Sequence, residues 1–310
     1  MVSKQLHSPK LQSDNFTSLS ICKSGQMPRF NPDKELSHMC TKLWTLDVNR
    51  LVPGKDYNLD LQGETKVYKR EDKAKDPLFL NVNEDKLKKL PTFKAFIALL
   101  DNYATETGVP EEVTPQEEKE NRHFLDEIMK TKVMKKCHEY LVKKQLASND
   151  ASQFKQQLYD LWFKLYRRTR GMREADSSGF EHVFVGECRG GTDEVIGFHN
   201  WIQYYLEEKR GNVDYQGWIR PRGKKSRSSA TDSHSQLISI QFTWKSDTKP
   251  VGSSFIGTSP EFEVALYTLV FFAGQHGKNY ISVADYDIEL VVHKMGDKLG
   301  SSYPVSLHKE

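Results

Sequence analysis

The chain has 310 residues, 37% of them hydrophobic and 28% charged, and its 45 basic and 42 acidic side chains leave a net charge of +3. This composition is polar for a globular protein but unlike that of a disordered chain, and the length allows one large domain or two. Bulk charge predicts no affinity for nucleic acid, so any such affinity must come from a local patch. The four cysteines show no regular spacing, which argues against structural zinc and favours reduced thiols.

No apolar run reaches the length of a membrane span, and residues 1–12 lack the apolar region of a secretory signal. We therefore expect an intracellular protein without a membrane-spanning segment, cytoplasmic or alternatively nuclear, and by default a monomer. Residues 1–33 are rich in Ser, Lys, Gln and Pro and show no periodicity, which predicts a disordered amino-terminal arm.

Residues 34–175 show mainly helical periodicity. Asp33 is placed to cap a first helix, and Thr114-Pro115-Gln116-Glu117 is typical of a helix start closed by a capping box. The helical period then continues without a break through Cys137. A further helix is expected to end in the basic stretch Lys164–Arg173, with Gly171 as its cap.

Residues 176–310 show a mixed pattern in which short strands alternate with two helices. The helices are expected from about Trp201 to Lys209 and from Pro260 onward, and residues 220–236 are expected to form an exposed loop. The fold class predicted is α+β, with a mainly helical amino-terminal half packed on a carboxyl-terminal half of antiparallel sheets with helices. The expected strands are Phe180–Val185, Leu237–Trp244, Ile281–Val283 and Ile288–Val292.

Two histidines, His182 and His199, are the residues best suited to exchanging protons near neutral pH. On the strand interpretation, His182 lies on one face while Glu181 and Glu187 lie on the other. A hairpin-like turn at residues 188–191 can bring the histidines together. A hydrogen-bonded structural histidine stays an alternative for each, and ligation of a metal by the two histidines and two glutamates ranks lower, because their spacing matches no compact ligand motif.

Four further stretches carry candidate functional groups. Pro and Gly residues in Lys249–Gly257 predict a turn that points a lysine and a serine in defined directions. In Gly300–Pro304 a tyrosine and two hydroxyls either face a ligand or close a sheet. Basic clusters at Lys164–Arg173 and Arg220–Arg227 form a weak pattern for contact with a nucleic-acid backbone, and solvated charge is the commoner explanation for each.

Four stretches in combination resemble the EndoU family, the uridylate-specific endoribonucleases related to XendoU. They are GFEHVFVGE at 179–187, GFHNW at 197–201, KPVGS at 249–253 and SPEFE at 259–263. The resemblance covers about residue 35 to the end and implies the EndoU fold. It also implies site residues by position: catalytic His182, His199 and Lys249, substrate-binding Ser253, Ser301 and Tyr303, and structural or metal-linked Glu181 and Glu187.

One departure from the family pattern concerns the tail, where Gly-Thr-Ala-Tyr-Pro is replaced by Gly-Ser-Ser-Tyr-Pro at 300–304. Ser301 therefore keeps the hydroxyl but loses the methyl group.

The implied activity is cleavage of single-stranded, uridine-containing RNA, with activation by Mn²⁺ or Ca²⁺ at an unknown site. The hypothesis is that His199 deprotonates the 2′-hydroxyl, His182 protonates the leaving 5′-oxygen, and Lys249 stabilises the charge on phosphorus. The products are then a 2′,3′-cyclic phosphate and a 5′-hydroxyl. An RNA-binding protein that no longer cuts is the first alternative, and a metal-assisted phosphodiesterase is the second.

Overall fold

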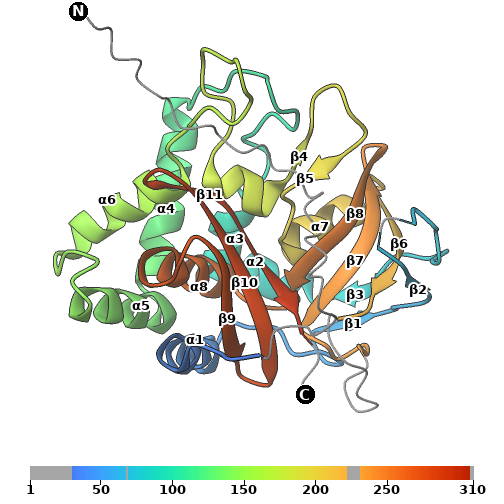
Figure 1. Ribbon diagram of the computed structural model, residues 1–310, viewed down its shortest axis with the longest axis horizontal. Helices are drawn as coiled ribbons and strands as arrows, with labels where there is room; N and C mark the ends of the chain where they lie inside the picture. Colours follow the sequence, from blue (N-terminus) through green and yellow to red (C-terminus); the bar gives the residue numbers. More distant parts are fainter. Residues whose placement is uncertain (1–29, 68, 222–230, 308–310) are drawn as a thin grey trace, which may run out of the picture. The chain divides into compact units, whose positions relative to one another are not determined.

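The computed structural model describes residues 30–67, 69–221 and 231–307 (Figure 1). Most of the arm expected at 1–33 lies outside the described residues, as do much of the loop expected at 220–236 and most of the second basic cluster. The proposed boundary between residues 175 and 176 stays a prediction.

The amino-terminal half is mainly helical, as predicted. Asp33 caps the first helix by accepting a hydrogen bond from the Leu36 amide at 2.9 Å. The capping box is also confirmed, since the Thr114 hydroxyl accepts from the Glu117 amide while the Glu117 carboxylate accepts from the Thr114 amide. The helices are α1 (Lys34–Leu46), α2 (Glu84–Lys89), α3 (Pro91–Ile97), α4 (Pro115–Met129), α5 (Lys132–Lys143) and α6 (Ala151–Trp162).

Two helix boundaries in this half differ from the prediction. The helical period through Cys137 predicts one continuous helix, but the structure has two. Helix α4 ends at Met129, and Thr131 caps the separate helix α5. Helix α6 ends at Trp162, so the basic stretch after it is a loop and Gly171 caps no helix. The backbone of Tyr166 leaves the helical path because it pairs instead with Ser177.

Short strands complete this half, and one of them joins a sheet of the other half. Strands β1 (Tyr57–Leu59) and β3 (Phe79–Val82) pair with each other in antiparallel fashion. Strand β2 (Glu64–Thr65) pairs in parallel with β6 (Val213–Ile219).

The carboxyl-terminal half contains antiparallel sheets and two α-helices, in agreement with the predicted α+β class. One sheet has the order β2-β6-β7-β8, a second has the order β11-β10-β9, and β4 and β5 form a small hairpin. The predicted strand at 237–244 and helix at 201–209 have the observed bounds. The elements are β4 (Glu187–Cys188), β5 (Val195–Ile196), α7 (Trp201–Lys209), β7 (Leu237–Trp244), β8 (Asp247–Phe255), α8 (Pro260–Ala273), β9 (Gly277–Val283), β10 (Tyr286–Met295) and β11 (Lys298–Ser306).

The strand predicted at Phe180–Val185 is wrong, because Glu181–Val185 forms a π-helical turn, η1. The Ser178 hydroxyl caps the turn by accepting from the Glu181 amide at 3.1 Å, and the Ser178 carbonyl accepts from the His182 amide. Every side chain of the turn is buried, so its apolar residues carry no period that separates helix from strand.

The turn predicted at Lys249–Gly257 is also wrong, because most of this stretch belongs to strand β8. Its proline and glycine produce a bulge rather than a turn. Ile240 pairs with Gly252 and Phe242 pairs with Lys249, which leaves an extra residue on β8 around Pro250. A bulge re-aims the side chains beside it.

Helix α8 lies at the centre of the hydrophobic core and is buried along nearly its whole length. It packs against α1, α3 and α5 on the helical side and against β10 and β11 on the sheet side (Figure 1). Strand β11 also packs against β8, so the two larger sheets meet there. Among the described helices, none combines the length and apolar character needed to cross a membrane.

Candidate active site

The backbone at Gly197–His199 runs directly against η1 and brings the two predicted histidines together. The Phe198 amide donates to the His182 carbonyl at 3.0 Å, and the His199 amide donates to the Val183 carbonyl at 2.7 Å. Gly197 has a φ of +62°, and a Cβ atom on it would lie 1.8 Å from the His182 carbonyl oxygen. Only glycine fits this approach.

His199 is buried and its ring has a defined orientation. Its Nδ1 lies 3.0 Å from the carbonyl oxygen of Ser253 on β8. A carbonyl only accepts hydrogen bonds, so Nδ1 carries the proton and Nε2 presents a free lone pair when the ring is neutral. The ring stacks on Tyr303 with centroids 4.6 Å apart, and Asn200 caps α7 directly after it.

The electrostatic environment of His199 favours the neutral ring. Burial, followed by the positive charges of Lys249 and His182, lowers the pKa of His199 well below 6.5. A neutral imidazole with a free Nε2 is the form that accepts a proton.

His182 lies in the opposite environment. Its Nδ1 donates to the Glu187 carboxylate at 2.5 Å, and both side chains are buried. Arg168 approaches the same carboxylate oxygen, with its Nε at 3.3 Å. A carboxylate at Nδ1 fixes the ring orientation and favours the positively charged imidazolium, which donates a proton from Nε2.

The two glutamates that flank His182 make different contacts. Glu187 contacts His182 and Arg168, whereas Glu181 accepts from the Ser178 amide and hydrogen-bonds Glu111. Burial raises the pKa of Glu181 well above 4.5 and that of Glu111 to about 7, so the two carboxyl groups can share a proton.

Lys249 lies at the β8 bulge and is only 6% exposed. Burial lowers its pKa from 10.5 to about 7, while the charges of Glu194 and Glu187 raise it and that of Arg189 lowers it. Its charge in turn lowers the pKa of His199, so the two groups are close enough to interact.

The three predicted substrate-binding residues come from the strands that line this region. The carbonyl of Ser253 orients His199, and its hydroxyl lies 2.6 Å from the Ser239 hydroxyl across β7 and β8. Ser301 and Tyr303 are two residues apart on β11 and so lie on the same face of the strand. Ser301 is buried, and the Tyr303 ring stacks on His199. These residues pair with β10, so the tail does close a sheet, and the Tyr303 ring at the same time lies against His199.

The sequence did not predict that Arg168 and Asp176 contact and support the candidate site. Arg168 joins Glu187 to the Gly300 carbonyl, to which its Nη2 donates at 2.6 Å. Asp176 holds Arg168 in place by accepting from its backbone amide at 2.7 Å. The only signal was the basic cluster that contains Arg168, and nothing in its spacing separated this arginine from its exposed neighbours.

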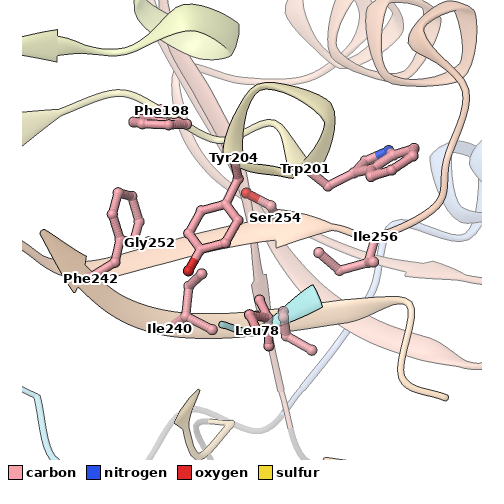
Figure 2. Close-up of a pocket in the computed structure, with 10 residues that line it drawn as sticks. Leu78, Phe198, Trp201, Tyr204, Ile240, Phe242, Gly252, Ser254 and Ile256 are labelled. Atoms are coloured by element: carbon pink, nitrogen blue, oxygen red, sulfur yellow. The ribbon is translucent and has the colours of Figure 1, made fainter. Parts of the chain in front are cut away.

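A pocket lies between α7 and strands β7 and β8 (Figure 2). None of the predicted site residues lines it. Its walls include Phe198, whose ring meets those of Phe242 and Trp244 at centroid distances of 5.2 and 4.8 Å. We interpret the pocket as packing space that fixes the backbone before His199.

Within residues 30–67, 69–221 and 231–307, no group of three or more His, Cys, Asp and Glu side chains is placed to hold a metal ion. The lower-ranked alternative, ligation by the two histidines and two glutamates, therefore does not fit the described geometry. Glu187 and Glu181 instead face His182 and Glu111.

The chain is similar to several known proteins. The sequence profile of the family described as Endoribonuclease XendoU matches residues 35–304. Poly(U)-specific endoribonuclease-B of Xenopus laevis is 51% identical over 280 residues, covering 88% of this chain and 94% of the relative. Uridylate-specific endoribonuclease B of Danio rerio is 50% identical over 278 residues, covering 88% and 96%.

A solved structure is similar over nearly its whole length. It is described as the structure of XendoU, a splicing-independent snoRNA-processing endoribonuclease, and it superimposes with a TM-score of 0.79 at 49% identity. The match covers 90% of this chain and 99% of the solved one. This chain belongs to the XendoU endoribonuclease family.

Proposed function

We propose that this protein is a uridylate-preferring endoribonuclease that cuts single-stranded RNA by attack of the 2′-hydroxyl on the adjacent phosphorus. The observation that carries the proposal is the opposite surroundings of the two imidazoles. His199 donates from Nδ1 to a carbonyl, whereas His182 donates from Nδ1 to a carboxylate. One ring is therefore set up to accept a proton and the other to give one.

In the proposed reaction His199 Nε2 takes the proton of the 2′-hydroxyl while O2′ forms a bond to phosphorus. The bond from phosphorus to O5′ then breaks, and His182 Nε2 gives its proton to the departing oxygen. Lys249, in its charged form, stabilises the negative charge on the non-bridging oxygens. The products are a 2′,3′-cyclic phosphate and a 5′-hydroxyl.

Substrate contacts are assigned to the residues beside His199. Tyr303 stacks on the His199 ring and is proposed to contact the ribose, and the Ser253 and Ser301 hydroxyls are proposed to contact uracil. Glu187 is proposed to brace His182. The proposed reaction needs no metal ion at phosphorus. Activation by Mn²⁺ or Ca²⁺, a monomeric state and a cytoplasmic location stay predictions.

The test uses an RNA oligonucleotide with one uridine beside the same oligonucleotide carrying 2′-deoxyuridine, each with and without Mn²⁺ and Ca²⁺. The unmodified RNA is expected to yield a cyclic phosphate, and the deoxyuridine version is expected to stay intact. Equal cutting of both would show that the 2′-hydroxyl is not the nucleophile. Binding of the unmodified RNA without cutting under every condition would favour the non-cleaving alternative.

A further inference from the structure

The loop between α6 and η1 carries an unusual density of positive charge. Residues 164–174 contain five basic side chains and one acidic side chain, Glu174. Four of the basic side chains are exposed and form no ion pair with another described residue. We call these four residues the basic loop: Lys164, Arg167, Arg170 and Arg173.

The fifth basic residue anchors this loop to the candidate active site. Arg168 contacts the Glu187 carboxylate that holds His182, and it donates to the carbonyl of Gly300, directly before Ser301. The exposed arginines thus lie within a few residues of a side chain that touches the catalytic machinery.

The base of the loop is held by a buried carboxylate. Asp176 accepts hydrogen bonds from the backbone amides of Arg168 at 2.7 Å and of Thr169 and Gly108 at 3.1 Å each. The Tyr166 backbone also pairs with Ser177. Because the base is fixed, the exposed guanidinium groups are presented from a defined position beside the site.

We propose that the basic loop binds the phosphates of RNA on the 3′ side of the cleaved bond. This inference rests on the proposed function, in which His182 protonates the departing 5′-oxygen. The nucleotides that leave with this oxygen exit on the side of His182, and Arg168 ties the loop to that side through Glu187. Exposed arginines outside ion pairs are well suited to phosphate oxygens.

Two other basic side chains, one beside β4 and one in the turn between β7 and β8, form contacts within the protein. Arg189 is paired with Glu194 at 3.0 Å, and Lys245 donates to the Thr105 hydroxyl. The positive charge outside ion pairs is therefore denser on the basic loop than on these two segments, which predicts a directional RNA-binding surface rather than uniform attraction. The net charge of +3 is too small to supply such attraction by itself.

The test compares three substrates that contain one uridine each: the dinucleoside monophosphate UpA, the pentamer UpApApApA with phosphates on the 3′ side, and ApApApUpA with phosphates on the 5′ side. The variant carries Arg167→Gln, Arg170→Gln and Arg173→Gln. A matched control removes the same charge on α5, which packs against α1 and α8, with Lys132→Gln, Lys135→Gln and Lys143→Gln. Circular dichroism melting confirms that each variant is folded.

The loop variant is expected to lose about tenfold in kcat/KM on UpApApApA and to keep its activity on UpA and ApApApUpA. Its dependence of log kcat/KM on log salt should also become shallower, by about 0.7 for each phosphate that the variant no longer binds. The control variant should match the wild type on all three substrates.

An equal loss on all three substrates would overturn the inference, because the loop would then act on folding or on catalysis. A loss confined to ApApApUpA would place the loop on the wrong side of the bond. Unchanged activity on every substrate would mean that the loop serves another partner, such as an acidic protein. If the wild type cuts none of the three substrates, the proposed function fails. The binding inference is then tested separately by fluorescence anisotropy with an uncut pentamer that carries 2′-deoxyuridine, to which the loop variant should bind more weakly than the wild type.

Discussion

The buried ammonium group of Lys249 predicts an unusual pH dependence. Its pKa of about 7 means that the charged form is lost as the pH rises through neutrality. The pKa of His199 is well below 6.5, so this base is already neutral in the same range. Of these two groups, Lys249 is therefore the one whose charge changes near neutral pH, and the activity that needs this charge should fall with increasing pH.

The substrate for this measurement is uridine 3′-(4-nitrophenyl phosphate), because nitrophenolate leaves without help from a general acid. The protonation of His182 therefore does not affect the pH profile of kcat/KM. For the free enzyme, kcat/KM should fall about tenfold per pH unit above neutrality, or about a hundredfold by pH ~9. In Lys249→Arg the guanidinium stays charged, so the profile should be flat even though the absolute rate is lower.

The matched control is Lys245→Arg, an exposed lysine on the same hairpin, which should leave both the rate and the profile unchanged. A fall that persists unchanged in Lys249→Arg would refute the assignment of this titration to Lys249. A wild-type profile that is flat from pH ~6 to ~9 would contradict the argument from burial.

Three further predictions concern the groups around His182. Glu187→Gln removes the carboxylate 2.5 Å from His182 Nδ1. Steady-state kinetics on RNA should then show a fall in kcat of about 10–100-fold with KM little changed. An unchanged kcat would contradict the proposal that Glu187 braces His182. Gly197→Ala places a methyl group against the His182 carbonyl at a φ of +62°, so thermal melting should show a clear loss of stability, and a wild-type melting temperature would argue against this close approach. The raised folded-state pKa of Glu111, about 7, means that the folded protein binds an extra proton between pH ~4.5 and ~7, so its stability should decrease as the pH rises through this window, and Glu111→Gln should weaken that decrease.

The sequence predicted which residues lie together at the candidate site more reliably than it predicted their local structure. The helix at 201–209 and the strand at 237–244 could be read from their patterns, because caps and β-branched residues mark them. The buried run at 180–185 could not, because η1 is buried on all sides and lacks the exposed polar face that reveals a helical period.

The contacts that orient the proposed catalytic side chains could not be predicted from local sequence patterns. His199 is set by a backbone carbonyl 54 residues away, and a carbonyl leaves no mark in the sequence. Arg168 looked like one member of a solvated cluster, yet it reaches Glu187 and a carbonyl on β11. By sequence alone Pro250 favours a turn, because proline occurs both in turns and at strand bulges. Only the pairing of β8 with β7 distinguishes the two.

The central claim is that His199 is the base and His182 the acid, and one comparison tests it most directly. His182→Ala and His199→Ala are each assayed on UpA, whose leaving group needs a proton, and on uridine 3′-(4-nitrophenyl phosphate), whose leaving group does not. His182→Ala should lose about 10²–10⁴-fold on UpA but less than about tenfold on the nitrophenyl ester, whereas His199→Ala should lose about 10²–10⁴-fold on both. The reverse pattern, with His199→Ala rescued by the better leaving group, would contradict the account.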